Sequence, residues 1–532
     1  MRITSTLLAL LAFMGAGIIR AQTSDDDDTR YIEATFDVMA PTVDTFARNF
    51  SVLTGTPAEI GLAMDVYMPE GDTATNRAAV VIFPTGNFLP PFINQGVYGS
   101  RKDSANVYLA QQLAARGFVA IVADYRQGWL PTAQSQVVRT ETLLQAAYRG
   151  GQDAKALARY LRKTIAEDDN PYGIDEDRFT FWGLGTGGYV TLTHAFLDNV
   201  DEIRTNNQFY DQDGNLLINV ARDGNVEGTQ AGAINMVNTP GYSSAVALTV
   251  NAGGALGDTT WISTGDNYTD GLVGFHRVQD PNAPFNIGTV IVPTTQSAVI
   301  TDVAGSHGAV RIANREGIND EFENINSTDI DDKFSDLSED LNELNATYQS
   351  MMLDTSGFPL SYDNLFPFIG EGGHWNWADE ATARAIIGQI NIARPTANLD
   401  ADLIISREKE GNPNFDDPAA AKRVIDTMIA YFIPRAYVAL NLGTVGTEFV
   451  TPASVSLELF PNPAAAGFTV RVAEQHLIRQ IDLYDINGRN VRRITGIDQS
   501  SRFVDRGNLP RGQYVVRLQV DEGVTARLIN LR

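Results

Sequence analysis

The chain of 532 residues contains no cysteine. This absence excludes disulfide bonds, cysteine-ligated zinc, iron–sulfur clusters, thiol catalysis and a cysteine-linked lipoprotein anchor. Basic residues are also scarce, because 40 Lys and Arg stand against 65 Asp and Glu, a formal net charge of −25. A chain this acidic repels phosphate backbones and anionic lipids, so nucleic acid is not an expected partner.

Long apolar runs are absent apart from one near the start of the chain. Leu7 to Ile19 is apolar, follows Arg2 and precedes the acidic tract 25–28. Its length suits a signal peptide and is too short to span a bilayer. We therefore expect a signal peptide over residues 1–21 and an exported protein with no transmembrane segment. The alternative is a buried N-terminal helix.

Composition is ordinary for a globular protein, with 43% apolar and 20% charged residues. After entry strands within residues 22–59, apolar runs typical of buried parallel strands alternate with helical patterns. The runs predict strands at 78–83, 118–123 and 179–182, and helices at 107–116, 146–163 and 418–440. This alternation predicts an α/β domain with a doubly wound, mostly parallel sheet.

The predicted α/β domain spans residues 60–442, and two stretches interrupt its rhythm. Residues 199–240 are rich in Asn, Asp and Gly, and residues 317–345 are acidic. We expect both to be insertions that cover the sheet as caps. After a linker at 443–451, residues 452–532 show short alternating strands and turn signals, which predict a small all-β sandwich.

Three motifs lie in order in this last segment. They are Phe460-Pro461-Asn462-Pro463, residues 481–489 and residues 509–518. Their order and spacing resemble the C-terminal sorting domain of the type IX secretion system of Bacteroidota. The resemblance implies that the type IX machinery is a partner. It also implies a secreted protein, either extracellular or at the outer-membrane surface of a Gram-negative bacterium. The alternative is a carbohydrate-binding sandwich.

Five further motifs follow one another between residues 60 and 440. They are Met64–Pro69, residues 152–161 with 172–175, Trp182–Gly188, Phe275–Pro281 and Gly372–His374. In this order they resemble the α/β-hydrolase fold, in particular secreted esterases of the carboxylesterase and feruloyl-esterase type. The resemblance implies a nucleophile, an acid and a base in that chain order. It implies no metal and no organic cofactor.

The nucleophile position of this motif holds no hydroxyl. The Gly-x-Ser-x-Gly pattern falls on residues 183–187, so Gly185 stands where the serine is expected. Glycine has no side chain and cannot attack a carbonyl. Shifting the pattern by one residue makes Thr186 the nucleophile, but it then places Leu184 where a small residue is required.

The loop that would stabilise an oxyanion is also altered. Where such esterases often carry His-Gly-Gly-Gly, this chain has Pro84-Thr85-Gly86-Asn87. Thr85, Gly86 and Asn87 still offer backbone N–H groups, and Thr186 N–H is the second expected donor. Phe88 follows as a further binding residue. The aromatic side chains Phe88, Phe92, Trp129 and Trp377 either line an acyl pocket or belong to the core.

Asp280 and His374 occupy the acid and base positions implied by the resemblance. Asp280 either orients the base or simply caps the turn at Pro281, since Asp-Pro commonly opens turns. His374 is either the base or a surface-loop histidine. His307 is a rival base, but it follows Asp280 too closely to leave room for a helix and a strand.

Three functions remain open from the sequence. The first is a non-catalytic or weakened pseudo-esterase that binds an extracellular ligand, such as a small ester or a glycan-derived molecule. The second is an active carboxylic-ester hydrolase that uses Thr186, or a water activated by His374 and Asp280. The third is a structural or adhesive surface protein. An open cleft above Gly185 favours the first two functions, and a cleft filled by side chains favours the third.

Overall fold

A computed structural model describes most of the chain. The described residues are 29–263, 267–292, 295–327, 332–335, 337, 363–369, 373–442, 451–485, 490–495, 497, 499–520 and 523–532. The expected signal peptide at residues 1–21, part of the expected insertion at 317–345 and residues 443–450 of the expected linker lie outside them.

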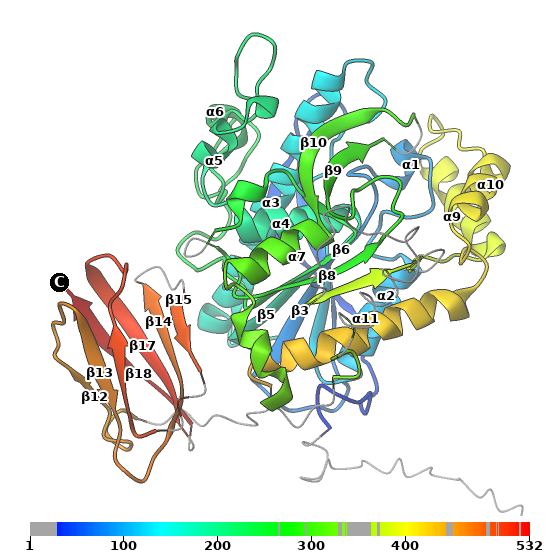
Figure 1. Ribbon diagram of the computed structural model, residues 1–532. Helices are drawn as coiled ribbons and strands as arrows, with labels where there is room; N and C mark the ends of the chain where they lie inside the picture. The colour runs from blue at the N-terminus through cyan, green and yellow to red at the C-terminus, as the bar shows by residue number, and fades with distance from the viewer. Residues whose placement is uncertain are drawn as a thin grey trace, which may run out of the picture.

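An eight-stranded sheet with helices on both faces forms the larger domain (Figure 1). Its strand order is β1-β2-β4-β3-β5-β6-β8-β11. The strands are β1 (Thr42–Ser51), β2 (Ala58–Tyr67), β3 (Arg77–Phe83), β4 (Val119–Ala123), β5 (Ile174–Leu184), β6 (Leu248–Ala252), β8 (Leu272–Arg277) and β11 (Leu365–Phe368). Only β2 runs against its neighbours, and all pairs from β4 to β11 are parallel. The expected doubly wound, mostly parallel sheet is confirmed.

The sheet is buried because its central strands are apolar on both faces. Every residue of β3 and β4 is buried, as two-sided coverage of a parallel sheet requires. One face packs on three helices, and the other packs on two. The first three are α3 (Gln136–Glu167), α4 (Thr186–Phe196) and α7 (Ser306–Arg315); the other two are α2 (Ser104–Ala114) and α11 (Pro418–Ala439).

Helix α3 begins ten residues before the expected start at 146. In the structure Asp153 lies in mid-helix and pairs with Arg126, with 2.8 Å between Arg126 Nε and Asp153 Oδ1. Both side chains are fully buried, so the pair is a tertiary contact.

The remaining elements of the larger domain are short or lie outside the main sheet. They are α1 (Pro91–Asn94), α5 (Val200–Arg204), η1 (Asn207–Phe209), α6 (Val220–Asp223), β7 (Ala255–Leu256), η2 (Thr259–Trp261), β9 (Ile287–Ile291), β10 (Ala298–Gly305), η3 (Asp320–Ser327), α9 (Glu380–Ala393) and α10 (Ala401–Gly411). Strands β7, β10 and β9 form a separate small sheet. No helix in the described ranges is long and apolar enough to cross a membrane.

The stretch 199–240 packs against α3. Tyr148 Oη donates to Gly224 O at 2.9 Å, and Gln152 Nε2 donates to Asp223 O at 2.8 Å. Arg126 reaches the same stretch, because its Nη1 donates to Ile234 O at 3.2 Å. This insertion therefore covers a helix, and the buried Arg126 anchors it to the core.

Two antiparallel sheets form the C-terminal sandwich. One contains β12 (Glu458–Phe460), β13 (Gly467–Arg471) and β16 (Ser501–Asp505); the other contains β15 (Asn490–Ile494), β14 (Ile478–Asp485), β17 (Gly512–Val520) and β18 (Gly523–Leu531). Their inner faces share one apolar core, separate from the cores of the larger domain. The expected all-β sandwich is confirmed.

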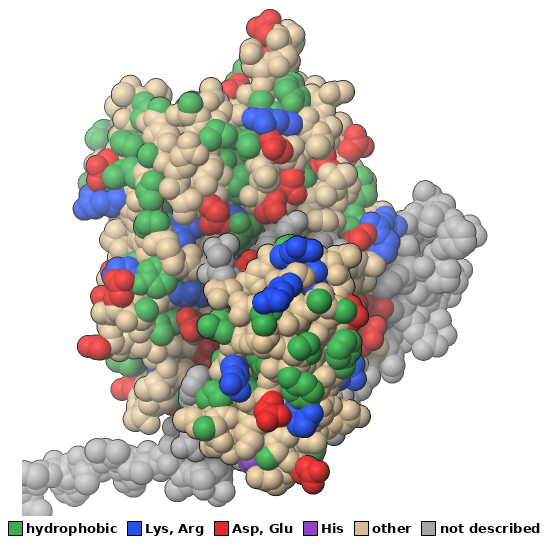
Figure 2. All heavy atoms as spheres, turned by 90° about the vertical axis from the view of Figure 1, so that its left-hand side faces the viewer, with side chains coloured by type: hydrophobic (Ala, Val, Ile, Leu, Met, Phe, Trp, Pro, Cys, Tyr) green, Lys and Arg blue, Asp and Glu red, His purple; other side chains and the backbone are tan. Residues whose placement is uncertain are grey.

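Charged groups join the sandwich to the larger domain. Arg493 of β15 pairs with Asp482 of its own domain at 2.8 Å and with Glu321 at 3.0 Å across the boundary. Arg517 pairs with Asp177 at 3.0 Å. Burial raises the pKa of Glu321 to about 7, although the nearby Arg493 opposes that rise. Figure 2 shows the side of the molecule on which the sandwich lies, with Lys and Arg side chains interspersed among Asp and Glu.

Removal of the Arg126 side chain tests how far the stability of the larger domain depends on the buried Arg126–Asp153 ion pair. We expect Arg126→Met to lower the free energy of unfolding by about 3–5 kcal/mol, since Asp153 is left buried without its counter-charge. The double variant Arg126→Met/Asp153→Leu should lose less, because no unpaired charge remains. Urea unfolding of the three proteins measures both values. Equal losses in the single and double variants would contradict this role.

Candidate functional site

A cavity of about 510 Å³ opens at the carboxyl ends of the parallel strands. This edge of an open α/β sheet is where ligands usually bind. All of the site residues predicted from the sequence except Phe88 line it: Thr85, Gly86, Asn87, Gly185, Thr186, Asp280 and His374. The structure therefore brings together residues from loops far apart in the chain.

Gly185 forms the corner of a sharp turn between β5 and α4. Its φ of 55° and ψ of −116° lie in a region that L-residues with a side chain rarely adopt. Its neighbours are equally crowded: a Cβ on Gly183 would stand 2.2 Å from Gly187 O, and a Cβ on Gly187 would stand 2.0 Å from Phe83 O. This strand–turn–helix is the geometry that a Gly-x-Ser-x-Gly elbow requires.

The Thr85 side chain fills the space beside that corner. A Cβ built on Gly185 would lie 2.2 Å from Thr85 Oγ1 and 2.9 Å from Thr85 Cβ. Both distances are far below van der Waals contact. The first atom of a nucleophilic side chain at position 185 therefore has no room while Thr85 keeps its place.

Thr186 is the first residue of α4, and its hydroxyl is nearly buried. Its Oγ1 lies 3.2 Å from Tyr125 Oη, which in turn donates to Pro84 O at 2.7 Å. Because a phenol carries one proton, the Thr186 hydroxyl donates to the Tyr125 oxygen. Sequence reasoning missed Tyr125, which follows β4 as one aromatic residue among many.

Asp280 accepts hydrogen bonds within its own turn. Its Oδ1 receives the backbone N–H groups of Asn282 at 2.8 Å and Ala283 at 3.0 Å. This is the turn-capping arrangement that an Asp-Pro sequence favours. His374 lies half-buried on the cavity wall, and its carbonyl accepts from Asn414 Nδ2 at 2.6 Å.

The loop after β3 holds three successive residues at positive φ. The angles are 138° at Gly86, 56° at Asn87 and 51° at Phe88. Such strained runs persist where the surrounding structure fixes them, and successive N–H groups in this kind of turn favour anions. The Phe88 side chain does not line the cavity, because it is fully buried against Tyr125 and Tyr189.

Of the other three aromatic residues expected to line a pocket, one lies on the cavity wall and two lie outside it. Trp129 lines the cavity. Phe92 instead lies under the Arg394 guanidinium, 4.1 Å from it, and Trp377 packs edge-on against Tyr108. Neither Phe92 nor Trp377 contributes to the wall.

The helical segment between residues 380 and 416 supplies a wall that the sequence motifs did not indicate. Glu408 and Gly411 of α10, and Asn412 after it, line the cavity together with Tyr98. Burial raises the pKa of both Glu408 and Tyr98. An amphipathic helix pattern is the only signal these residues carry, and it does not reveal a cavity.

A serine–histidine pair exists elsewhere in the domain. Ser306 Oγ lies 2.8 Å from His276 Nδ1, but it donates to Phe275 O at 3.1 Å. Both side chains are fully buried, and neither lines the cavity. The pair therefore belongs to the core.

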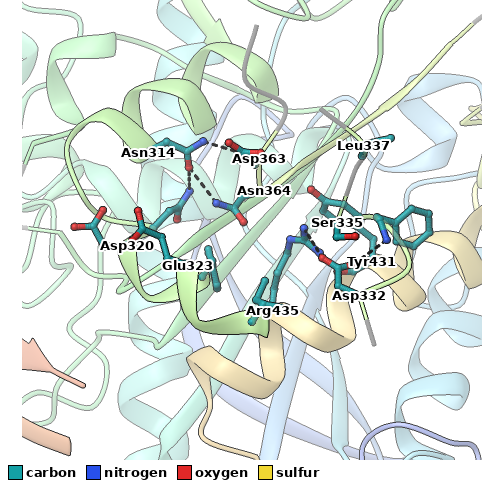
Figure 3. Close-up of a pocket in the computed structure, with 14 residues that line it drawn as sticks. Asn314, Asp320, Glu323, Asp332, Ser335, Leu337, Asp363, Asn364, Tyr431 and Arg435 are labelled. Carbon is teal, nitrogen blue, oxygen red and sulfur yellow. Dashed lines mark hydrogen bonds and ion pairs between the residues drawn. The ribbon is translucent and has the colours of Figure 1, made fainter. Parts of the chain in front are cut away.

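A second cavity of about 270 Å³ lies at the opposite edge of the sheet (Figure 3). It is next to the amino ends of β8 and β11, where Asn319 Oδ1 accepts from Leu272 N at 2.7 Å. Its polar side chains largely bond one another: Asn364 Nδ2 donates to Asn314 Oδ1 at 3.2 Å, and Arg435 pairs with Asp332. It holds none of the residues that the sequence motifs indicated.

Comparison with known proteins identifies the C-terminal part of the chain. The family model described as secretion system C-terminal sorting domain matches residues 458–530. No curated protein matches the sequence significantly.

Solved structures of esterase 2 from Thermogutta terrifontis are similar to the chain. The form phosphoramylated by tabun has 18% identity and a TM-score of 0.28, covering 46% of this chain and 74% of that one. The native form has 17% identity and a TM-score of 0.28, covering 46% and 73%. At these values the likeness assigns no activity. The sheet topology and the family match lead to one conclusion: an α/β-hydrolase-fold domain precedes a secretion system C-terminal sorting domain in a secreted or cell-surface protein.

Proposed function

We propose that this secreted, esterase-like protein is a non-catalytic receptor that binds an extracellular ligand in the cavity above Gly185. The observation that carries the proposal is the filled nucleophile space. The elbow turn is retained, glycine stands at its corner, and Thr85 fills the volume where a serine side chain would begin.

The geometry of Thr186 supports the same proposal. A threonine nucleophile needs a base within hydrogen-bond reach of its hydroxyl. Thr186 Oγ1 is instead hydrogen-bonded to Tyr125 Oη, and burial raises the pKa of that phenol. A phenol whose pKa is raised is a poor base at neutral pH.

The size of the cavity argues against the third function, a structural or adhesive surface protein. A volume of about 510 Å³ lies within the range of small-molecule sites. A structural protein has no need of an open cavity at this edge, so an open cleft above Gly185 favours ligand binding.

Ester hydrolysis separates the receptor from an active enzyme. We expect the full chain to hydrolyse p-nitrophenyl acetate and butyrate no faster than Thr186→Val and His374→Asn, because neither side chain attacks or activates a nucleophile. Initial rates over the neutral pH range measure this. A wild-type rate about tenfold or more above that of Thr186→Val would show a threonine-dependent hydrolase.

The crowding at position 185 is tested by stability. We expect Gly185→Ser to lower the free energy of unfolding by about 2–4 kcal/mol, from backbone strain and overlap with Thr85. Adding Thr85→Gly should recover part of the loss, since it removes the overlapping atoms. Thermal unfolding of both single variants and the double variant gives this coupling. Additive losses would show that Thr85 does not hold that space.

A further inference from the structure

Arg277 is a cation on the cavity wall that forms no ion pair with any residue the structure describes. It is the last residue of β8 and is half-buried. Its Nε is buried and makes no hydrogen bond, and no ion pair to its guanidinium occurs within the part of the chain that the structure describes. Placing a guanidinium in a partly buried site without a partner costs free energy, and an anion would offset that cost.

The side chain of Arg277 is positioned by its packing. Its Cγ lies 2.7 Å from where a Cβ on Gly373 would stand, and the φ of Gly373 is +86°. Glycine at this position therefore lets the Arg277 stem pass. Asp280 lies three residues further on and lines the same cavity, but no ion pair joins it to Arg277 within the described residues, and its Oδ1 accepts the N–H groups of its own turn.

Backbone donors on the same cavity also favour an anion. Helix α4 has eleven residues, no acidic side chain in its first turn and no side chain at its N-cap. For the Thr186 and Gly187 N–H groups, the described residues provide no acceptor. The positive end of the helix dipole therefore faces this edge of the sheet.

The remaining side chains of the cavity restrict the chemistry of the rest of the ligand. Glu408 on α10 adds a carboxylate that repels an anion at that end. Trp129, Leu143 and Val290 provide apolar surface within the same cavity. A ligand complementary to these side chains has one anionic group and an otherwise apolar or aromatic structure.

We propose that the cavity binds a monocarboxylic acid, with its carboxylate paired to the Arg277 guanidinium and its tail against the apolar wall. A planar guanidinium fits a carboxylate with two parallel hydrogen bonds, which distinguishes the acid from its neutral derivatives. The inference rests on the proposed function, since it names the ligand class of that receptor site.

Binding of matched acids and amides tests this assignment. The full chain is titrated calorimetrically with butanoate, hexanoate, benzoate and phenylacetate, and with the primary amide of each. We expect at least one acid to bind about tenfold or more tightly than its amide, since a charge-assisted pair is replaced by neutral contacts. Arg277→Gln should abolish that preference, and Arg277→Lys should keep part of it.

The control variant is Arg315→Gln, because Arg315 lies outside the cavity and pairs with the adjacent Glu316. It should bind like wild type. The assignment is overturned if no acid binds, if acids and amides bind equally, or if the preference survives in Arg277→Gln with an unchanged melting temperature. Threonine-dependent ester hydrolysis would instead overturn the receptor role. The titration of acids against amides would still show whether Arg277 selects a carboxylate, so the two failures can be told apart.

Discussion

Backbone crowding at residues 183–188 is the constraint on which the rest of the site depends. Strands β3, β5 and β6 approach the first turn of α4 so closely that a Cβ on Gly188 would lie 2.2 Å from Asn251 Oδ1. Only glycine passes through such contacts without displacing the neighbouring strands. The tight turn fixes the N-terminus of α4 at the carboxyl edge of the sheet, and this placement positions the cavity floor.

The turn and the chemistry place different demands on position 185. The turn needs a residue that tolerates positive φ, and glycine meets this need with less strain than serine. The chemistry needs a hydroxyl, which glycine lacks. A chain with glycine here therefore keeps the fold and the cavity at lower strain, and Thr85 packs into the volume that a side chain would otherwise occupy. Retention of the elbow is thus no evidence for catalysis.

Sequence patterns predicted those features that local chemistry decides. Strands β3 and β4 were evident because an uninterrupted apolar run is typical of a strand buried on both faces. The corner at Gly185 followed from motif spacing. The first ten residues of α3 were missed because tertiary contacts bury polar residues there, such as Thr140, whose Oγ1 donates to Val299 O. Arg277 and Glu408 carry no local signal, since only the fold brings them to one cavity.

The sorting domain and the cavity are independent parts of the molecule. The cavity wall consists of residues between Thr85 and Asn412, so the site is complete without the sandwich. The contacts between the domains include ion pairs such as Arg493 with Glu321. If the sandwich is removed after export, the charged partners of these ion pairs become hydrated, whereas an apolar interface would leave an exposed hydrophobic patch. A charged boundary is therefore compatible both with docking before removal and with solubility of the larger domain afterwards.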